Sequence, residues 1–200
     1  MALPELARVL DPDESRWRPL PAAVGELLML LDAPARLAAH LRLVHDVAWQ
    51  LTDQLATRYP ALSVDPDTVR YGAASHDIGK VIHVDELVGP GSRHEAAGRT
   101  LLIAHGVPQQ LARFAGTHAS WTAPDTTIDD HVVSLADKIW KAKRVSGLED
   151  LITAELVRTC RVERWQAFAD LDDILNHVAA GADQRLAYQA QYPGHPPAHT

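Results

Sequence analysis

The chain has 200 residues, of which 46% are hydrophobic and 22% are charged, and its formal net charge is −7. This composition fits one globular domain, with or without a helical extension, and differs from that of disordered chains. Nucleic acids are bound through broad basic surfaces, so the negative charge argues against a bulk nucleic-acid partner. Any anionic substrate must therefore be small and held locally.

Cysteine content and hydropathy suggest a cellular compartment. A single cysteine, Cys160, cannot form an intramolecular disulfide, which fits a reducing cytosol. The N-terminal segment MALPELARVLDPDESRW carries acids where a signal peptide needs a basic start and an apolar run. No segment reaches a membrane-spanning length. From the sequence we expect a cytoplasmic protein with no membrane partner, and a homodimer is one option for its oligomeric state.

Hydrophobic periodicity predicts an all-α protein. Nearly every segment has helical period, and no run of alternating β-branched residues is found. Helices are expected at about 20–32, 34–58, 66–82, 92–106, 108–119, 127–144, 148–159 and 161–191.

Local signals indicate several helix ends. Asp65 is a favourable N-cap residue and Pro66 suits a first turn. Ser92 can cap the next helix, with Glu95 three residues later. Gly106 is expected to end that helix, because glycine favours the position after a helix C-terminus.

The strongest local signal for chemistry is the segment AASHDIGK, in which His76 and Asp77 follow an apolar helix. An imidazole and a carboxylate are both ligands for divalent metals, and side by side they can converge on one ion. Alone, the pair is a weak signal, since His45-Asp46 is another in the same chain and most such pairs are merely solvated. The surrounding residues give it weight.

Asp137 is the next candidate ligand. It lies in the segment SLADKIW, with Val133 four residues before it and Trp140 three after, so its carboxylate is expected beside an apolar helix stripe. A buried carboxylate requires a partner. That partner is either a metal ion or an arginine or lysine in a salt bridge.

Helical geometry favours His40 over His45 as a further ligand. Val44, Val47 and Leu51 lie within about 60° of His40 on a helical wheel, so His40 shares the stripe that faces the core. His45 is rotated from His40 by about 140°, at the edge of the stripe. A hydrogen-bonded core histidine is the alternative role for His40.

His40, His76-Asp77 and Asp137, in this order along a helical chain, resemble the H…HD…D signature of the HD-domain superfamily of metal-dependent phosphohydrolases. The resemblance covers about residues 34–145, and the pair is followed by Ile-Gly-Lys, as in family members. It implies an HD-domain helical bundle. It also implies that a small phosphate ester or nucleotide is hydrolysed through a metal-activated water.

Two further histidines, His94 and His118, lie between the pair and Asp137 and match the extended pattern H…HD…H…H…D of members that hold two metals. By this resemblance Asp77 bridges both ions, and His94 and His118 bind the second. The alternative is an exposed helix-start residue and a helix-end residue stabilised by the helix dipole. The implied cofactor is a divalent metal, two ions of iron or manganese, with Mg, Zn, Co and Ni as further options.

Lys80, Arg93 and Lys138 lie beside candidate ligands in the sequence and are candidates for holding a phosphate oxygen. Asp77 and Lys80 are the candidate catalytic residues. Solvated helix ends explain such lysines equally well. His83, just after the HDIGK segment, is a weaker candidate for contact with substrate.

Two other functions remain open at this level. Some HD-fold proteins use the same six ligands for a diiron centre that oxygenates C–H bonds. A ligand-binding HD module without activity is less favoured, because no expected ligand position is missing. The chain lacks a GYP motif after its HD pair, which argues against the cyclic-dinucleotide phosphodiesterase branch. Its six-ligand pattern is closer to small diiron hydrolases of dinucleoside polyphosphates.

The resemblance also suggests how the chain is organised. We expect an N-terminal helical extension at 1–33, an HD domain core at 34–145, C-terminal helices packed on the core at 146–192, and a flexible, proline-rich tail at 193–200.

Overall fold

The computed structural model describes residues 2–192, which form helices and no strand. The prediction of an all-α protein is confirmed, whereas the predicted tail at 193–200 lies outside the described residues. The α-helices are α1 (Ala2–Leu10), α2 (Ala22–Leu30), α3 (Ala35–Arg58), α4 (Pro66–Ser75), α5 (Arg93–Ala104), α6 (Gln109–Ala112), α7 (Phe114–Thr117), α8 (Ile128–Ile139), α9 (Ser146–Cys160), α10 (Arg164–Ala179) and α11 (Ala182–Ala190). Two short 3-10 helices, η1 (Ile78–Val81) and η2 (Val84–Leu87), lie between α4 and α5.

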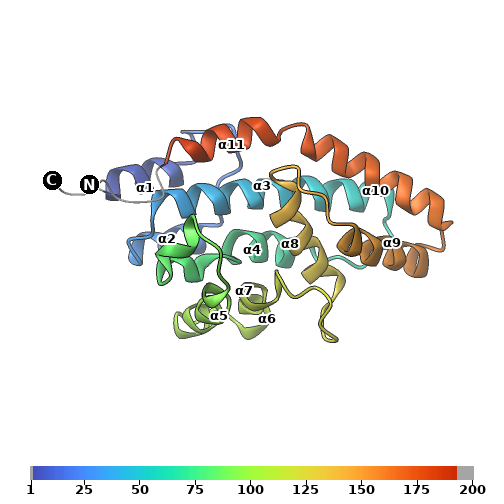
Figure 1. Cartoon of the computed structure of the whole chain (residues 1–200), viewed down its shortest axis with the longest axis horizontal. Coiled ribbons are helices and arrows are strands. Elements are labelled where there is room, and N and C mark those ends of the chain that lie inside the picture. The colour runs from blue at the N-terminus through green and yellow to red at the C-terminus, as the bar shows by residue number, and fades with distance from the viewer. Residues whose placement is uncertain (1, 193–200) are drawn as a thin grey trace.

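Helix α3 is the central element of the molecule. Figure 1 shows α10 and α11 along one side of it and α4 along the other, with α5, α6 and α7 beyond α4. Helix α3 packs against α1, α4, α8, α10 and α11. Within residues 2–192, no helix combines the length and the apolar character needed to cross a bilayer.

The length of α3 follows from its sequence. Its 24 residues contain neither glycine nor proline, the two residues that most disfavour a helix interior. Pro34 precedes the first turn, where a missing N–H is tolerated. Pro60 follows Tyr59, and the residue before a proline avoids helical dihedral angles. The helix therefore runs without interruption through the core.

Two clusters of buried apolar side chains meet along α3. Leu37 and Leu41 belong to the cluster formed with α1, α2 and the α5–α6 region. Leu43 and Val44 belong to the cluster formed with α4, α8, α9 and α10. His40 lies at the boundary between the two clusters, so its polar ring is held by rigid packing on both sides.

Helix α4 ends earlier than its apolar pattern predicts. It stops at Ser75 and not near residue 82, and the chain continues as the 3-10 helix η1. Asp65 and Pro66 begin α4 as expected, and the Asp65 carboxylate accepts hydrogen bonds from two backbone N–H groups of the first turn. The change of winding after Ser75 is decided by a tertiary contact of η1 with α5, described below.

Two of the predicted helices are divided in the structure. The segment 108–119 forms α6 and α7, which are separated at Arg113. The segment 161–191 forms α10 and α11, which are separated at Gly181. Glycine in a helix interior has a high conformational entropy cost, so this boundary has a local cause.

Two more helix ends differ from the prediction. Helix α8 ends at Ile139, because Ala142 has a φ of +58° and a left-handed residue cannot continue a right-handed helix. The predicted end near residue 144 is therefore wrong. Helix α1 lies within the helical extension expected at 1–33, but no helix range was predicted for it, although Leu6 and Val9 are fully buried on its inner face.

Arg42 joins the N-terminal segment to α3. Its guanidinium is fully buried and donates hydrogen bonds to backbone carbonyl groups of the segment that follows α1. The acceptors include Asp11 O at 2.7 Å, Pro12 O at 3.3 Å and Trp17 O at 2.9 Å, together with Val9 O. A buried charge is tolerated when its donors are satisfied in this way.

Arg185 makes the corresponding junction at the other end of the chain. It is 1% exposed, and it donates to Trp140 O and to Val178 O, both at 2.6 Å. Trp140 is the C-cap residue of α8. The contact thus holds α11 against the end of α8, beside the candidate functional site.

Candidate metal centre

The close approach of η1 to α5 positions Asp77. Gly79 lies against the backbone of α5, where a Cβ atom would be 2.0 Å from His94 O and 2.6 Å from Gly98 N. Only glycine fits at this contact. Asp77 precedes η1 with φ −101° and ψ 9°, outside the helix, and its carboxylate lies between α3, α5 and α8.

Four side-chain atoms form a first group around Asp77. His40 Nε2 lies 3.1 Å from Asp77 Oδ2 and 3.3 Å from His76 Nε2. His76 Nε2 lies 3.4 Å from Asp137 Oδ1. Ligands bonded to one ion at about 2.1 Å are separated by roughly 3.0–3.4 Å for octahedral or tetrahedral angles. Two further distances, from His40 Nε2 to Asp137 Oδ1 and from His76 Nε2 to Asp77 Oδ2, are 3.6 Å, so the four atoms lie at or slightly beyond the spacing for one divalent cation.

A second group shares the same aspartate. Asp77 Oδ1 lies 3.0 Å from His94 Nε2 and 3.5 Å from His118 Nε2. Asp77 Oδ1 and His94 Nε2 are buried and form no hydrogen bond with the described residues. A buried lone pair without a partner is costly, and a cation would satisfy both atoms. One carboxylate thus offers one oxygen to each of two adjacent groups.

Backbone carbonyls orient two of the histidines. His76 Nδ1 lies 2.9 Å from Ala73 O, and His118 Nδ1 lies 3.2 Å from Phe114 O. A ring that donates from Nδ1 keeps a free lone pair on Nε2, which is the atom that faces the cluster. The carbonyl groups of Ala73 and Phe114 thus orient the two rings so that Nε2 is available to a cation.

Glu86 orients the third histidine and was missed by sequence reasoning. Its Oε2 lies 2.6 Å from His94 Nδ1 and accepts the His94 backbone N–H at 3.1 Å. Its Oε1 accepts from the backbone N–H and the Nε of Arg93. Burial opposes ionisation, but these hydrogen bonds outweigh it and lower the pKa of Glu86 to about 2. Glu86 also replaces Ser92 as the cap of α5, because the Ser92 side chain makes no capping hydrogen bond.

Charge and burial act differently on the four histidines of the cluster. Burial opposes protonation of all four rings, but Asp77 and Asp137 raise the pKa of His76, and Asp77 and Glu86 raise that of His94. Burial lowers the pKa of His118 to about 4 and also lowers that of His40, so both rings are neutral at pH 7. Burial would raise the pKa of Asp77, but the charge of His76 and the adjacent His40 ring hold it well below its usual value. Neutral imidazoles around a carboxylate are typical metal ligands.

Burial and contacts distinguish the alternative roles of His94, His118 and His45. His94 is 5% exposed and His118 is 4% exposed, so the interpretation of these residues as exposed helix-end histidines is wrong. His45 lies away from the cluster, and its Nε2 accepts a hydrogen bond from Trp49 Nε1 at 3.2 Å. Of the two histidines weighed on α3, only His40 reaches Asp77.

The family model described as HD domain matches residues 37–140, just over half of the chain. The chain belongs to the HD domain family. HD domains are typically metal-dependent phosphohydrolases, and the buried histidine and aspartate cluster is consistent with the HD motif. Comparison with curated proteins and with solved structures gives no match.

Two lysines of the HD domain contact the ligand carboxylates. Lys80 Nζ lies 2.5 Å from Asp77 Oδ2, and Lys138 Nζ lies 2.6 Å from Asp137 Oδ2. The salt bridge weighed for Asp137 therefore exists, but it uses one oxygen while the other faces the histidines. Both lysines line a cavity of about 400 Å³ that opens onto the cluster.

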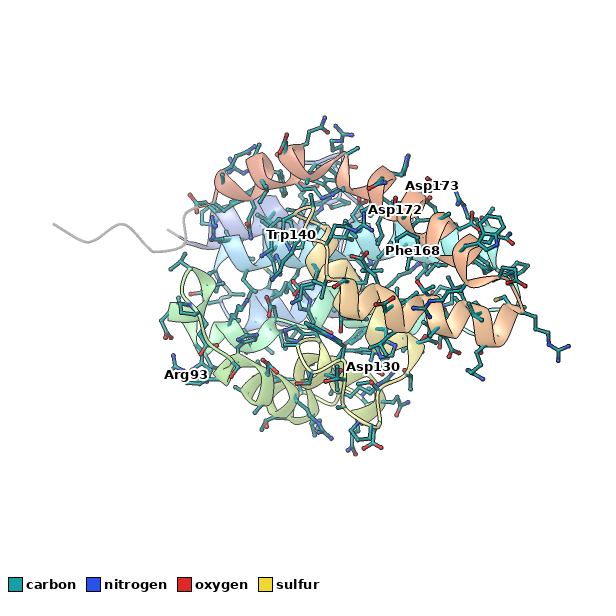
Figure 2. The ribbon with its side chains drawn as sticks, turned by 45° about the vertical axis from the view of Figure 1, so that its right-hand side comes forward. Arg93, Asp130, Trp140, Phe168, Asp172 and Asp173 are labelled. Carbon is teal, nitrogen blue, oxygen red and sulfur yellow. The ribbon has the colours of Figure 1, made fainter. Side chains whose placement is uncertain are left out.

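Arg93 was predicted to bind substrate, but its side chain lies away from the cavity. Figure 2 shows it at the edge of the molecule, pointing away from the centre. Its guanidinium pairs with Asp85 and Glu86, and it does not line the cavity. His83 does not line the cavity either. Arg93 instead contributes to the hydrogen bonds that hold Glu86 beside His94.

Proposed function

We propose that this HD domain is a metal-dependent phosphohydrolase that acts on a small phosphate ester or nucleotide. The observation that carries the proposal is the position of Asp77, whose two oxygens face two separate groups of ligand atoms. The six candidate ligands are His40, His76, Asp77, His94, His118 and Asp137. With divalent metal bound, this site would supply an acidified water as the nucleophile and neutralise charge on the phosphoryl oxygens.

The residues around the cluster support an anionic substrate. The cavity is lined by four cationic side chains and three carboxylates (Asp77, Glu95 and Asp137), so cations outnumber acids there although the chain as a whole carries a charge of −7. The four are Arg36, Lys80, Lys138 and Lys141. Because the walls have low dielectric, such a cluster attracts an anion more strongly than the same charges would in open solvent. This feature favours hydrolysis of a phosphate ester over oxygenation of a neutral substrate.

The size of the cavity supports a small substrate. Its volume of about 400 Å³ lies near the lower end of the range for small-molecule sites, about 300–1,000 Å³. Trp140 and Leu37 supply apolar surface beside the charged groups. A phosphorylated metabolite or a single nucleotide fits these dimensions, whereas a polymer would require an open groove.

The test combines metal analysis with product detection. The purified protein is expected to contain about two equivalents of metal and to release phosphate from a panel of phosphate esters and nucleotides without oxygen. Asp77→Ala should lose both properties, because this side chain faces both groups. Asp150→Ala, which alters an exposed ion pair with Arg164, is the matched control. Oxygen consumption without phosphate release would overturn the proposal in favour of the oxygenase.

A further inference from the structure

Arg36 lies in the cavity one helical turn before His40 on α3. One of its terminal nitrogens donates to Tyr192 O at 3.2 Å. Its Nε is buried and has no hydrogen-bond partner within residues 2–192. No carboxylate of the described chain lies within ion-pair distance of its guanidinium. Within residues 2–192 the positive charge of Arg36 therefore has no carboxylate partner, although its side chain lines the cavity beside the candidate metal ligands.

Lys141 is a second cation of the cavity without a carboxylate partner among the described residues. It lies just past the end of α8, four residues after Asp137, and it lines the same cavity as Arg36. Its ammonium group lies 5.8 Å from the centre of the Trp140 ring and has no carboxylate partner within the described residues. Lys80 and Lys138, by contrast, are held against ligand carboxylates.

The cavity thus contains two pairs of cations with different surroundings. The inner pair, Lys80 and Lys138, adjoins the metal ligands and is available to the phosphate that reacts. The outer pair, Arg36 and Lys141, has charge to offer to a second group. A guanidinium presents its N–H donors in a planar fork that matches the oxygens of a phosphate.

A purely structural role does not account for Arg36. Structural arginines in this chain commit more donors and are almost completely buried: Arg42 donates to four backbone carbonyl groups and Arg185 to two. Arg36 makes one such bond, to Tyr192 O. An arginine carries five N–H donors, so most of those of Arg36 are uncommitted.

We infer that Arg36, assisted by Lys141, binds a second anionic group of the substrate, and that the preferred substrates are phosphate esters bearing another phosphate away from the reacting one. This inference rests on the proposed hydrolase function. Leu186 and Gln189 of α11 line the same cavity and leave room for the part of the substrate that links the two groups. Arg36 is then a specificity-determining residue rather than a catalytic one.

A matched pair of substrates tests the inference. Adenosine 3′,5′-bisphosphate differs from adenosine 5′-monophosphate by one additional phosphate. The wild-type protein should have the lower KM for the bisphosphate. Arg36→Met should raise that KM about tenfold, the loss expected for one charge-assisted contact, with little change in kcat. Its constants for the monophosphate should change less than about twofold, within the error of such contact energies.

Three further variants make the result specific. Arg36→Lys should keep part of the affinity for the bisphosphate, because lysine retains the positive charge but lacks the planar N–H donors of a guanidinium. Lys141→Met should act in the same direction as Arg36→Met and does not disturb the contact with Tyr192 O. Arg58→Met changes an arginine on the same helix that pairs with Asp170 on the surface, and it should leave both substrates unaffected.

The outcomes separate this inference from the proposed function. If the wild type hydrolyses both nucleotides equally and Arg36→Met slows both alike, the inference is wrong and the hydrolase remains. If neither nucleotide is hydrolysed, calorimetric binding of the bisphosphate to the metal-free protein still tests Arg36. Binding about tenfold weaker in Arg36→Met would support the inference. Equal binding in wild type, Arg36→Met and Lys141→Met would overturn it.

Discussion

Glu86 and His94 form a buried pair in which the carboxylate Oε2 lies 2.6 Å from the ring Nδ1, while the ring Nε2 faces Asp77. The ring is thereby fixed from the side opposite to the cluster. Carboxylates that orient a ligand histidine raise its basicity and hold its tautomer. Glu86 is therefore a positioning residue for the second group of ligands.

Glu86→Gln should weaken metal binding at the second group about 10–100-fold, because the amide orients and polarises the ring less than the carboxylate does. The first group should keep its metal. The measurement is metal content after dialysis against a graded series of chelator concentrations. Glu155→Gln, which changes a carboxylate paired with Arg158 on α9, is the control. Unchanged retention of both metals in Glu86→Gln would contradict the role given to Glu86.

His94→Ala and His118→Ala should each remove about one metal equivalent and lower turnover sharply, since both rings face the same oxygen of Asp77. His105→Ala and His131→Ala should change neither quantity, because these residues belong to neither ligand group. Metal content and phosphate release are measured on the same preparations. Full metal content in both His94→Ala and His118→Ala would mean that the centre holds one ion.

His45 should make the fold less stable in mild acid. Burial lowers its pKa from 6.5 to about 4 in the folded protein, so between these values the unfolded chain binds a proton that the folded chain does not. Stability is complete above pH 6.5 and decreases as the pH falls toward 4. At pH 5 the folded protein should be less stable by about 2 kcal/mol because of His45 alone.

Urea unfolding of wild type and His45→Gln at pH 7 and pH 5 measures this effect. Glutamine keeps an acceptor for Trp49 Nε1 but does not titrate. The variant should lose less stability than the wild type between the two pH values. An identical loss in both proteins would assign the acid sensitivity to other groups.

Gly79→Ala should destabilise the protein by about 3 kcal/mol, the upper end of overpacking costs, because the new methyl group would overlap backbone atoms of α5. Metal affinity should fall as well, since the same contact positions Asp77. Gly147→Ala is the matched control, at a glycine whose added methyl group would meet nothing within 4 Å. Thermal unfolding and metal content report both effects. A Gly79→Ala protein as stable as Gly147→Ala would show that η1 can move away from α5.

The part of the site that lies on regular helix could be predicted from the sequence. The stripe shared by His40, Val44 and Leu51 requires only an uninterrupted helix, and α3 contains no residue that would break it. The position of Asp137 beside Trp140 follows from the same periodicity on α8. In these places local pattern and tertiary packing agree.

The remaining part depends on contacts that no periodicity encodes. Glu86 reaches His94 across a segment predicted as a loop, so nothing in the spacing relates the two residues. The end of α4 is set by the fit of Gly79 against the α5 backbone, which overrides an apolar pattern that continues past it. The place of Arg36 in the cavity could not be predicted from the sequence either, because the cavity is completed by α11, which is distant in the sequence.

Arg42 shows that the N-terminal segment, which lies outside the matched residues, supports the helix that carries His40. The match begins at residue 37, yet the carbonyl groups that satisfy this buried guanidinium belong to residues 9–17. A shortened chain starting at residue 37 would keep the Arg42 guanidinium and lose the carbonyl groups that accept its hydrogen bonds. Arg42 lies two residues from His40 on α3. The stretch of chain that must fold together is thus longer than the stretch that carries the motif. Side chains of this segment add to the attachment, since Trp17 is buried in the apolar cluster and Arg18 pairs with Asp46 on α3. An insertion between α1 and Trp17 should therefore disturb the helix that carries His40.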